Sequence, residues 1–178
     1  MTFTIMARCD RTGQVGISMA TVSLAVGGLC PFYTQEGDLV SSQAYAQPRL
    51  GMEAVRLLTA GCSLGDLKTK LEADDSFFEY RQIGIVKRSG ERFVHTGANT
   101  RPWAGHGIGS NYLVMGNVLA GPHVLAAMED AFRNGGGNLG DRLLAGIEAG
   151  RDAGGQVNAK GEHCAERSAA LLVLSDRS

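Results

Sequence analysis

A hydroxyl side chain stands directly behind the start methionine, because the chain opens Met1-Thr2-Phe3. If Met1 is removed, Thr2 carries a free α-amine beside its own hydroxyl, which pairs a nucleophile with a built-in general base. The pKa of an α-amine is about 7.7–8.0, so near neutral pH much of it can act as a base. If Met1 is retained, the amine lies on the wrong residue and this chemistry is blocked. Thr2 is therefore a candidate catalytic nucleophile, with an ordinary strand residue as the alternative.

Two further side chains are candidates for a catalytic site. Asn117 stands between Gly116 and an apolar run, and its amide is suited to donate to an oxyanion. The alternative is a turn asparagine in left-handed backbone. His106 lies in the glycine-rich segment 103–109, and an imidazole with a pKa near 6.5 is a useful base. The alternative, which we favour for His106, has Trp103 as a packing anchor and His106 as its hydrogen-bonded neighbour.

No metal and no cofactor are expected. Gly105, Gly107 and Gly109 resemble a phosphate loop, but no lysine follows them. Arg81 and Gln82 are expected to make hydrogen bonds at a strand edge rather than to bind a substrate. The remaining histidines and the cysteine beside one of them do not have the spacing of metal ligands: His95, His123, His163 and Cys164.

The composition is that of one soluble globular domain, residues 1–178, with 44% hydrophobic and 20% charged residues. The net charge of −1 predicts no attraction to nucleic acid or to an anionic membrane. No apolar stretch approaches the ~20 residues of a membrane span. The four cysteines are scattered and no signal peptide is recognisable, so a reduced, cytoplasmic protein is expected. Glycine, with 25 residues, is about twice as frequent as usual, which indicates tight turns and close packing of layers.

The spacing of apolar residues along the chain predicts the strands and helices that must position the candidate residues. Alternation with period 2 predicts strands that begin at Thr2 and Val15, and strands over 38–46, 81–87, 91–96 and 112–119. A period of 3.6 predicts helices over 50–61, from Ser63 onward, from Pro122 to the glycines at 135–137, and over 139–150. We expect a loop with a short edge strand over 23–38, a mobile loop over 152–166 and a buried strand over 168–174.

Two helix pairs separated by a strand-rich block favour an α+β domain with helical layers outside two stacked sheets, a four-layer αββα sandwich. Periodicity does not assign layers, so a two-layer domain with helices on one face of one sheet is the competing prediction. The same spacings predict a set of buried residues: Phe3, Ile5, Val15, Ile17, Leu57, Leu58, Ile83, Ile85, Phe132 and Leu171.

Five segments resemble a bacterial family catalogued as domain of unknown function 1028. They lie at 1–5, 81–86, 96–106 (ending Trp-Ala-Gly-His), 116–121 (Gly-Asn-Val-Leu-Ala-Gly) and 168–173. The resemblance implies the Ntn-hydrolase-like, proteasome-like αββα fold, in which an N-terminal Thr, Ser or Cys often cleaves amide bonds. The chain departs from the family pattern at Met115, Thr100 and Arg167, where Gln, Cys and Gln are common, and in a long insertion over 158–165. Its first lysine, Lys68, lies on a predicted helix, whereas proteasome-type chemistry needs a lysine from an early strand.

Two functions remain open at this point. The first is an amidohydrolase of N-terminal-nucleophile type that acts on a small molecule, with Thr2 as nucleophile and Asn117 with backbone N–H groups around the oxyanion. The second is a non-catalytic ligand-binding or assembly protein of the same fold. A homodimer or larger homo-oligomer is expected in either case, because closed two-fold pairing is the commonest assembly.

Overall fold

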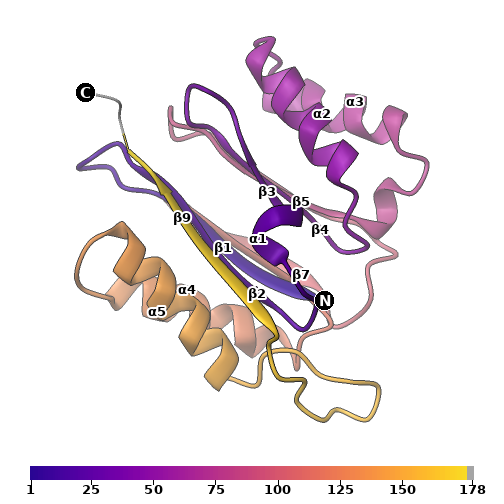
Figure 1. Ribbon diagram of the computed structural model, residues 1–178, viewed down its shortest axis with the longest axis vertical. Coiled ribbons are helices and arrows are strands. Elements are labelled where there is room, and N and C mark those ends of the chain that lie inside the picture. The colour runs from indigo at the N-terminus through magenta and orange to yellow at the C-terminus, as the bar shows by residue number, and fades with distance from the viewer. Residues whose placement is uncertain (176–178) are drawn as a thin grey trace.

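The computed structural model describes residues 1–175, which form two antiparallel sheets with helices outside them (Figure 1). The larger sheet has the strand order β7 (Gly105–Ile108), β8 (Tyr112–Asn117), β1 (Thr2–Arg8), β2 (Val15–Thr21) and β9 (Ser168–Leu174). The smaller sheet has the order β3 (Pro31–Tyr33), β4 (Leu39–Gln43), β5 (Gln82–Val86) and β6 (Arg92–Thr96). The first strand, which carries Thr2, is therefore the central strand of its sheet.

Two helix pairs cover different sheets. Helices α4 (Pro122–Asn134) and α5 (Leu139–Asp152) pack on the larger sheet, and α2 (Pro48–Thr59) and α3 (Leu64–Asp74) pack on the smaller one (Figure 1). Local sequence sets the helix starts: Ser63 Oγ accepts the Asp66 N–H at 3.1 Å, and Pro122 occupies the first turn of α4. This arrangement excludes the competing prediction, in which the helices lie on one face of a single sheet.

Strand alternation divides the apolar residues into three clusters. In β1, Phe3 and Ile5 pack under α4 and α5, whereas Met6 points the other way, toward the smaller sheet. Gly84 of β5 lets the two sheets approach closely, because a Cβ there would lie 2.8 Å from Met115 Cε. The alternation also turns Thr2 and Thr4, like Met6, toward the space between the sheets. Both faces of β1 are consequently buried.

Most predicted elements are confirmed, with four differences. The segment 168–174 is a strand, but Leu171 is 46% exposed, because β9 is an edge strand that pairs only with β2. The glycine-rich segment 103–109 contains a strand, β7, and the segment 23–38 contains a short helix, α1 (Val26–Leu29). A 3₁₀ turn, η1, spans Phe78–Tyr80. None of the helices within residues 1–175 is long and apolar enough to cross a membrane.

Candidate functional site

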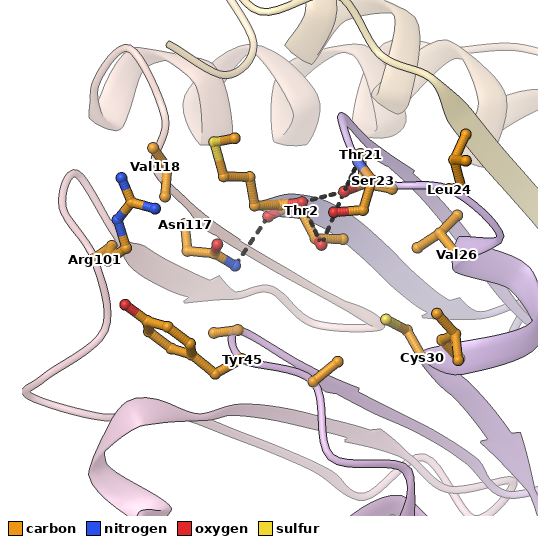
Figure 2. Close-up of a pocket in the computed structure, with 14 residues that line it drawn as sticks. Thr2, Thr21, Ser23, Leu24, Val26, Cys30, Tyr45, Arg101, Asn117 and Val118 are labelled. Atoms are coloured by element: carbon orange, nitrogen blue, oxygen red, sulfur yellow. Dashed lines mark hydrogen bonds between the residues drawn. The ribbon is translucent and has the colours of Figure 1, made fainter. Parts of the chain in front are cut away.

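A cavity of about 250 Å³ opens at the N-terminal end of β1, between the edges of the two sheets (Figure 2). Figure 2 shows Arg101, Tyr45 and Val118 on one side of Thr2, and Leu24, Val26 and Cys30 on the other. The wall is therefore built from segments far apart in the sequence, which meet where β1, β2, β4 and β8 begin or end. The full lining comprises Met1, Thr2, Thr21, Ser23, Leu24, Val26, Leu29, Cys30, Ala44, Tyr45, Ala46, Arg101, Asn117 and Val118.

Thr2 lies in this cavity wall with its side chain almost fully buried. Its Oγ1 donates to the Met1 carbonyl at 2.7 Å and lies 3.4 Å from Thr21 Oγ1. The Thr21 hydroxyl also donates to the Met1 carbonyl, so two hydroxyls hold that group. Burial lowers the pKa of the Met1 α-amine below its ordinary value, and the Arg101 guanidinium acts in the same direction. The environment that holds this amine thus favours its neutral, basic form.

Asn117 lies opposite Thr2 in the β1–β8 pairing and is buried. Its Nδ2 donates to the Thr2 carbonyl at 3.3 Å and to Gln82 Oε1 at 2.9 Å. Both amide hydrogens therefore have acceptors, and the side chain fixes the main chain of Thr2. Asn117 ends a strand, and the left-handed backbone lies at the next residue, Val118, with φ 58°. The alternative of a left-handed turn asparagine is therefore wrong.

A buried polar network continues from Asn117 into the space between the sheets. Gln82 Nε2 donates to the Gly116 carbonyl at 2.9 Å, and Gln82 Oε1 accepts from Gln43 Nε2 at 3.1 Å. Gln43 Oε1 accepts from Thr4 Oγ1 at 2.6 Å. Gln43, Gln82 and Thr4 have no exposed surface. The expectation that Gln82 bonds at a strand edge is wrong, because alternation in β5 points its side chain inward with Gly84.

His106 is separated from the cavity wall. Its Nδ1 lies 2.8 Å from Thr96 Oγ1, and that oxygen accepts from Gln82 Nε2 at 2.9 Å. Burial lowers the pKa of His106, so the ring is neutral near pH 7. His106 is thus a hydrogen-bonded neighbour of Thr96, rather than of Trp103, and reaches Thr2 only through Thr96, Gln82 and Asn117. Trp103 packs against the core under α4 and α5, as the packing-anchor interpretation predicts.

The backbone of the cavity wall is unusual. Ala44, Tyr45 and Val118 all line the cavity and have φ values of 58°, 48° and 58°, which side-chain-bearing residues seldom adopt. Arg81 supports this segment, because its guanidinium donates to the Tyr45 carbonyl and pairs with Asp75 at 2.8 Å. Left-handed non-glycine residues that surrounding contacts hold in place tend to cluster at functional sites. The backbone conformation therefore indicates the same candidate site as the side chains do.

Sequence reasoning missed several residues of this site. Thr21 and Cys30 belong to no recognisable sequence motif. Arg101 lies in a loop whose apolar residues follow no regular spacing. Burial raises the pKa of the Cys30 thiol to about 11, so it is protonated at neutral pH. Gln43 and Gln82 could have been noticed as polar residues at inward positions of apolar strands. The lining residues include neither a lysine nor a carboxylate, and within residues 1–175 no cluster of three potential ligands could hold a metal.

Comparisons with known proteins agree with this architecture. Protein SPO2555 from Silicibacter pomeroyi, described with the family model DUF1028, is 31% identical, with a TM-score of 0.85 over 98% of this chain and 76% of that chain. Thiobacillus denitrificans BPH, solved in complex with epoxomicin, is 14% identical with a TM-score of 0.59 over 98% of both chains, a likeness of fold alone. No curated protein matches. The model of the family of unknown function DUF1028 matches residues 2–178, and the chain therefore belongs to the DUF1028 family.

Proposed function

We propose that this protein is a hydrolase of N-terminal-nucleophile type, which cleaves a C–N amide bond of a small molecule once Met1 has been removed. The observation that carries the proposal is the Thr2 hydroxyl, which lies in the wall of a cavity at the start of the central strand. We interpret the two sheets and their outer helix pairs as the four-layer αββα sandwich of this class. The fold shared with Thiobacillus denitrificans BPH, which holds epoxomicin, supports that interpretation.

In the proposed reaction Thr2 Oγ1 attacks the amide carbonyl carbon, and its proton passes to the α-amine that Thr2 gains when Met1 leaves. The C–N bond then breaks, the leaving amine takes that proton, and the acyl group stays on Oγ1 as an ester. Water attacks the ester with the same α-amine as base. This step releases a carboxylic acid and restores the hydroxyl.

The surrounding residues position the nucleophile in this proposal. Asn117 holds the Thr2 carbonyl, and Gln82 holds Asn117. If Asn117 also donates to the oxyanion, it gives up the longer of its two bonds, the one of 3.3 Å to Thr2. Burial and the Arg101 guanidinium lower the pKa of the Met1 α-amine at this cavity. Once Met1 has left, we expect the Thr2 α-amine beside the same cavity to be shifted in the same direction, which favours an unprotonated base. His106 does not contact the reacting atoms in this scheme.

The test combines intact mass with hydrolysis by a Thr2→Ala variant. We expect the purified protein to lack Met1 and to release amine from at least one member of a series of small N-acyl compounds. Thr2→Ala should lose essentially all of this activity, roughly the 10⁴-fold or more that follows the loss of a nucleophile. Its stability should change little, because the side chain contributes one hydroxyl and one methyl group. Thr2→Ser, which keeps the hydroxyl, is the matched control. Retained Met1 in the active protein, or full activity of Thr2→Ala, would refute the proposal.

A second candidate is a ligand-binding protein that uses the same cavity without catalysis. The observation that favours it is the absence of a lysine from the lining residues, because proteasome-type chemistry needs a lysine near the nucleophile. A purified protein that keeps Met1 and binds small N-acyl compounds without hydrolysing them would establish this function instead.

A further inference from the structure

Arg101 is the single charged side chain among the lining residues of the cavity. Its backbone is fixed, because the Val118 N–H donates to the Arg101 carbonyl at 3.2 Å and the Leu119 N–H donates to the Trp103 carbonyl at 2.9 Å. The side chain is exposed, and in Figure 2 it lies between Val118 and Tyr45, on the same side of Thr2 as Asn117. A solvated cation is thus anchored beside the proposed nucleophile.

The electrostatics of the cavity favour an anion. Within the described part of the chain, Arg101 forms no ion pair, and the lining residues include no carboxylate. The guanidinium is close enough to the Met1 α-amine to lower its pKa, so the positive charge of Arg101 acts on the interior of the cavity. Arginine binds a carboxylate through two parallel hydrogen bonds, a geometry that lysine does not reproduce. A substrate with a carboxylate would supply the missing negative charge.

The rest of the wall favours an apolar group. Leu24, Leu29 and Tyr45 line the cavity while remaining 60%, 43% and 55% exposed. Leu24 and Tyr45 lie on opposite sides of Thr2, and Arg101 lies on the side of Tyr45, so an apolar group and a carboxylate can flank one scissile amide (Figure 2). The cavity, at about 250 Å³, is slightly smaller than the range of about 300–1,000 Å³ usual for drug-sized ligands. A small molecule fits it better than a long peptide.

We propose that the substrate is a small N-acyl amino acid, whose carboxylate binds Arg101 and whose apolar groups contact Leu24, Leu29 and Tyr45. This inference rests on the proposed hydrolase function, of which it names the substrate class. Arg101 would then determine specificity and contact the substrate directly, at the carboxylate rather than at the scissile bond.

Binding to the Thr2→Ala protein tests the inference without catalysis. N-acetyl-leucine and its uncharged analogue N-acetyl-leucinamide are titrated at millimolar concentration by calorimetry. We expect the acid to bind roughly 10- to 100-fold more tightly than the amide, and a further Arg101→Gln substitution to remove the difference. Arg101→Lys should restore part of it, and Arg11→Gln, on an exposed residue outside this cavity, should change nothing.

The outcomes separate the inference from the proposed function. Equal binding of acid and amide, no binding of the acid, or an unchanged preference in Arg101→Gln would overturn the inference. Hydrolysis of uncharged amides would still leave the hydrolase proposal in place. Conversely, Arg101-dependent binding of the acid in a protein that keeps Met1 and hydrolyses nothing would support the anion site while refuting the hydrolase.

Discussion

Gln82 connects the candidate site to the interior of the protein. Its carboxamide oxygen accepts from Asn117 and Gln43, and its nitrogen has Thr96 Oγ1 and the Gly116 carbonyl within 2.9 Å. The side chain has no exposed surface, so these partners cannot turn to water instead. In a buried network of this kind each polar group depends on its neighbours for hydrogen bonds. The position of Thr2 therefore depends on a residue of the other sheet.

Replacement of Gln82 by leucine should destabilise the protein by about 2–4 kcal/mol. The substitution nearly preserves volume but leaves the amide groups of Asn117 and Gln43 without their acceptor, and a buried unpaired polar group costs about 1–3 kcal/mol. Urea unfolding followed by circular dichroism measures the change. Gln35→Leu, at an exposed position, is the control and should shift stability by less than about 0.5 kcal/mol. A Gln82→Leu protein as stable as the control would show that the network contributes no net stability.

Thr2 and Asn117 were both identified as candidates from the sequence, and they meet because antiparallel pairing places them opposite each other. The partners that hold them could not be identified in the same way. Gln43 and Gln82 lie on strands of the other sheet, and which sheet faces which is decided by long-range packing rather than by local pattern. Arg101 depends on a loop whose path follows from contacts with Val118 and Leu119.

At the scale of elements, the cavity wall depends on a buried ion pair between Asp75, which follows α3, and Arg81, which follows η1. Arg81 and Asp75 have side chains only 10% and 9% exposed, and Arg81 also donates to the Tyr45 carbonyl. Burial opposes ionisation of Asp75, but the hydrogen bonds from Arg81 and from the Phe77 N–H outweigh it, so the pKa of Asp75 lies below its usual value. Tyr45 is thereby tied to a charged pair outside the cavity.

Asp75→Asn should destabilise the protein by about 3 kcal/mol at pH 7, because it leaves a buried guanidinium without its counter-charge. The folded pKa of Asp75 is depressed, so its stabilising contribution is present above the unfolded pKa of about 3.9 and is lost as pH falls through the folded value. The difference in urea midpoint between wild type and variant should therefore shrink below about pH 4. Asp74→Asn, in an exposed pair with Arg49, is the control and should change stability by at most about 1 kcal/mol. A constant difference from pH 7 to pH 3 would contradict this assignment.

The helices and most strands followed from hydrophobic period, because each helix buries one stripe and each strand at least one face. The strand β7 did not, since Gly105 and Gly107 contribute no side chains to an alternating pattern. The prediction that Leu171 is buried was wrong because its strand lies at the edge of the sheet. Ser168–Leu174 has the composition of a buried strand, yet β9 pairs on one side only and leaves Leu171 exposed.

At the scale of the whole molecule, the space between the sheets changes character along β1. It is apolar around Met6 and Met115 and becomes polar toward Thr2, where Gln43, Gln82 and Asn117 meet. The apolar end holds the sheets together, while the polar end fixes the strand terminus that lines the cavity. A site at the end of two packed sheets can therefore be buried on one side and open on the other without weakening the core.

Helix α2 leaves apolar surface on the outside of the molecule, which bears on self-association. Met52 is 56% exposed and Val55 is partly exposed, and both line a shallow hollow with Phe32 and Tyr33. Because Met52 is this exposed, it does not belong to the stripe that α2 buries against the smaller sheet. We propose a two-fold dimer that pairs this face with the same face of a second copy, since such a contact buries the apolar residues of both copies at once.

Light scattering should return about twice the monomer mass at micromolar concentration, and the interface should bury roughly 1,200 Å² or more in total. Met52→Glu places a charge in that contact and should shift the protein toward monomer, because an unpaired buried charge opposes association strongly. Leu144→Glu, on the exposed face of α5, is the matched control and should leave the mass unchanged. A monomer mass that does not vary with concentration would refute the dimer. A dimer that is sensitive to Leu144→Glu alone would place the interface on α5 instead. That interface would cover the helix pair of the larger sheet rather than the helix pair of the smaller sheet.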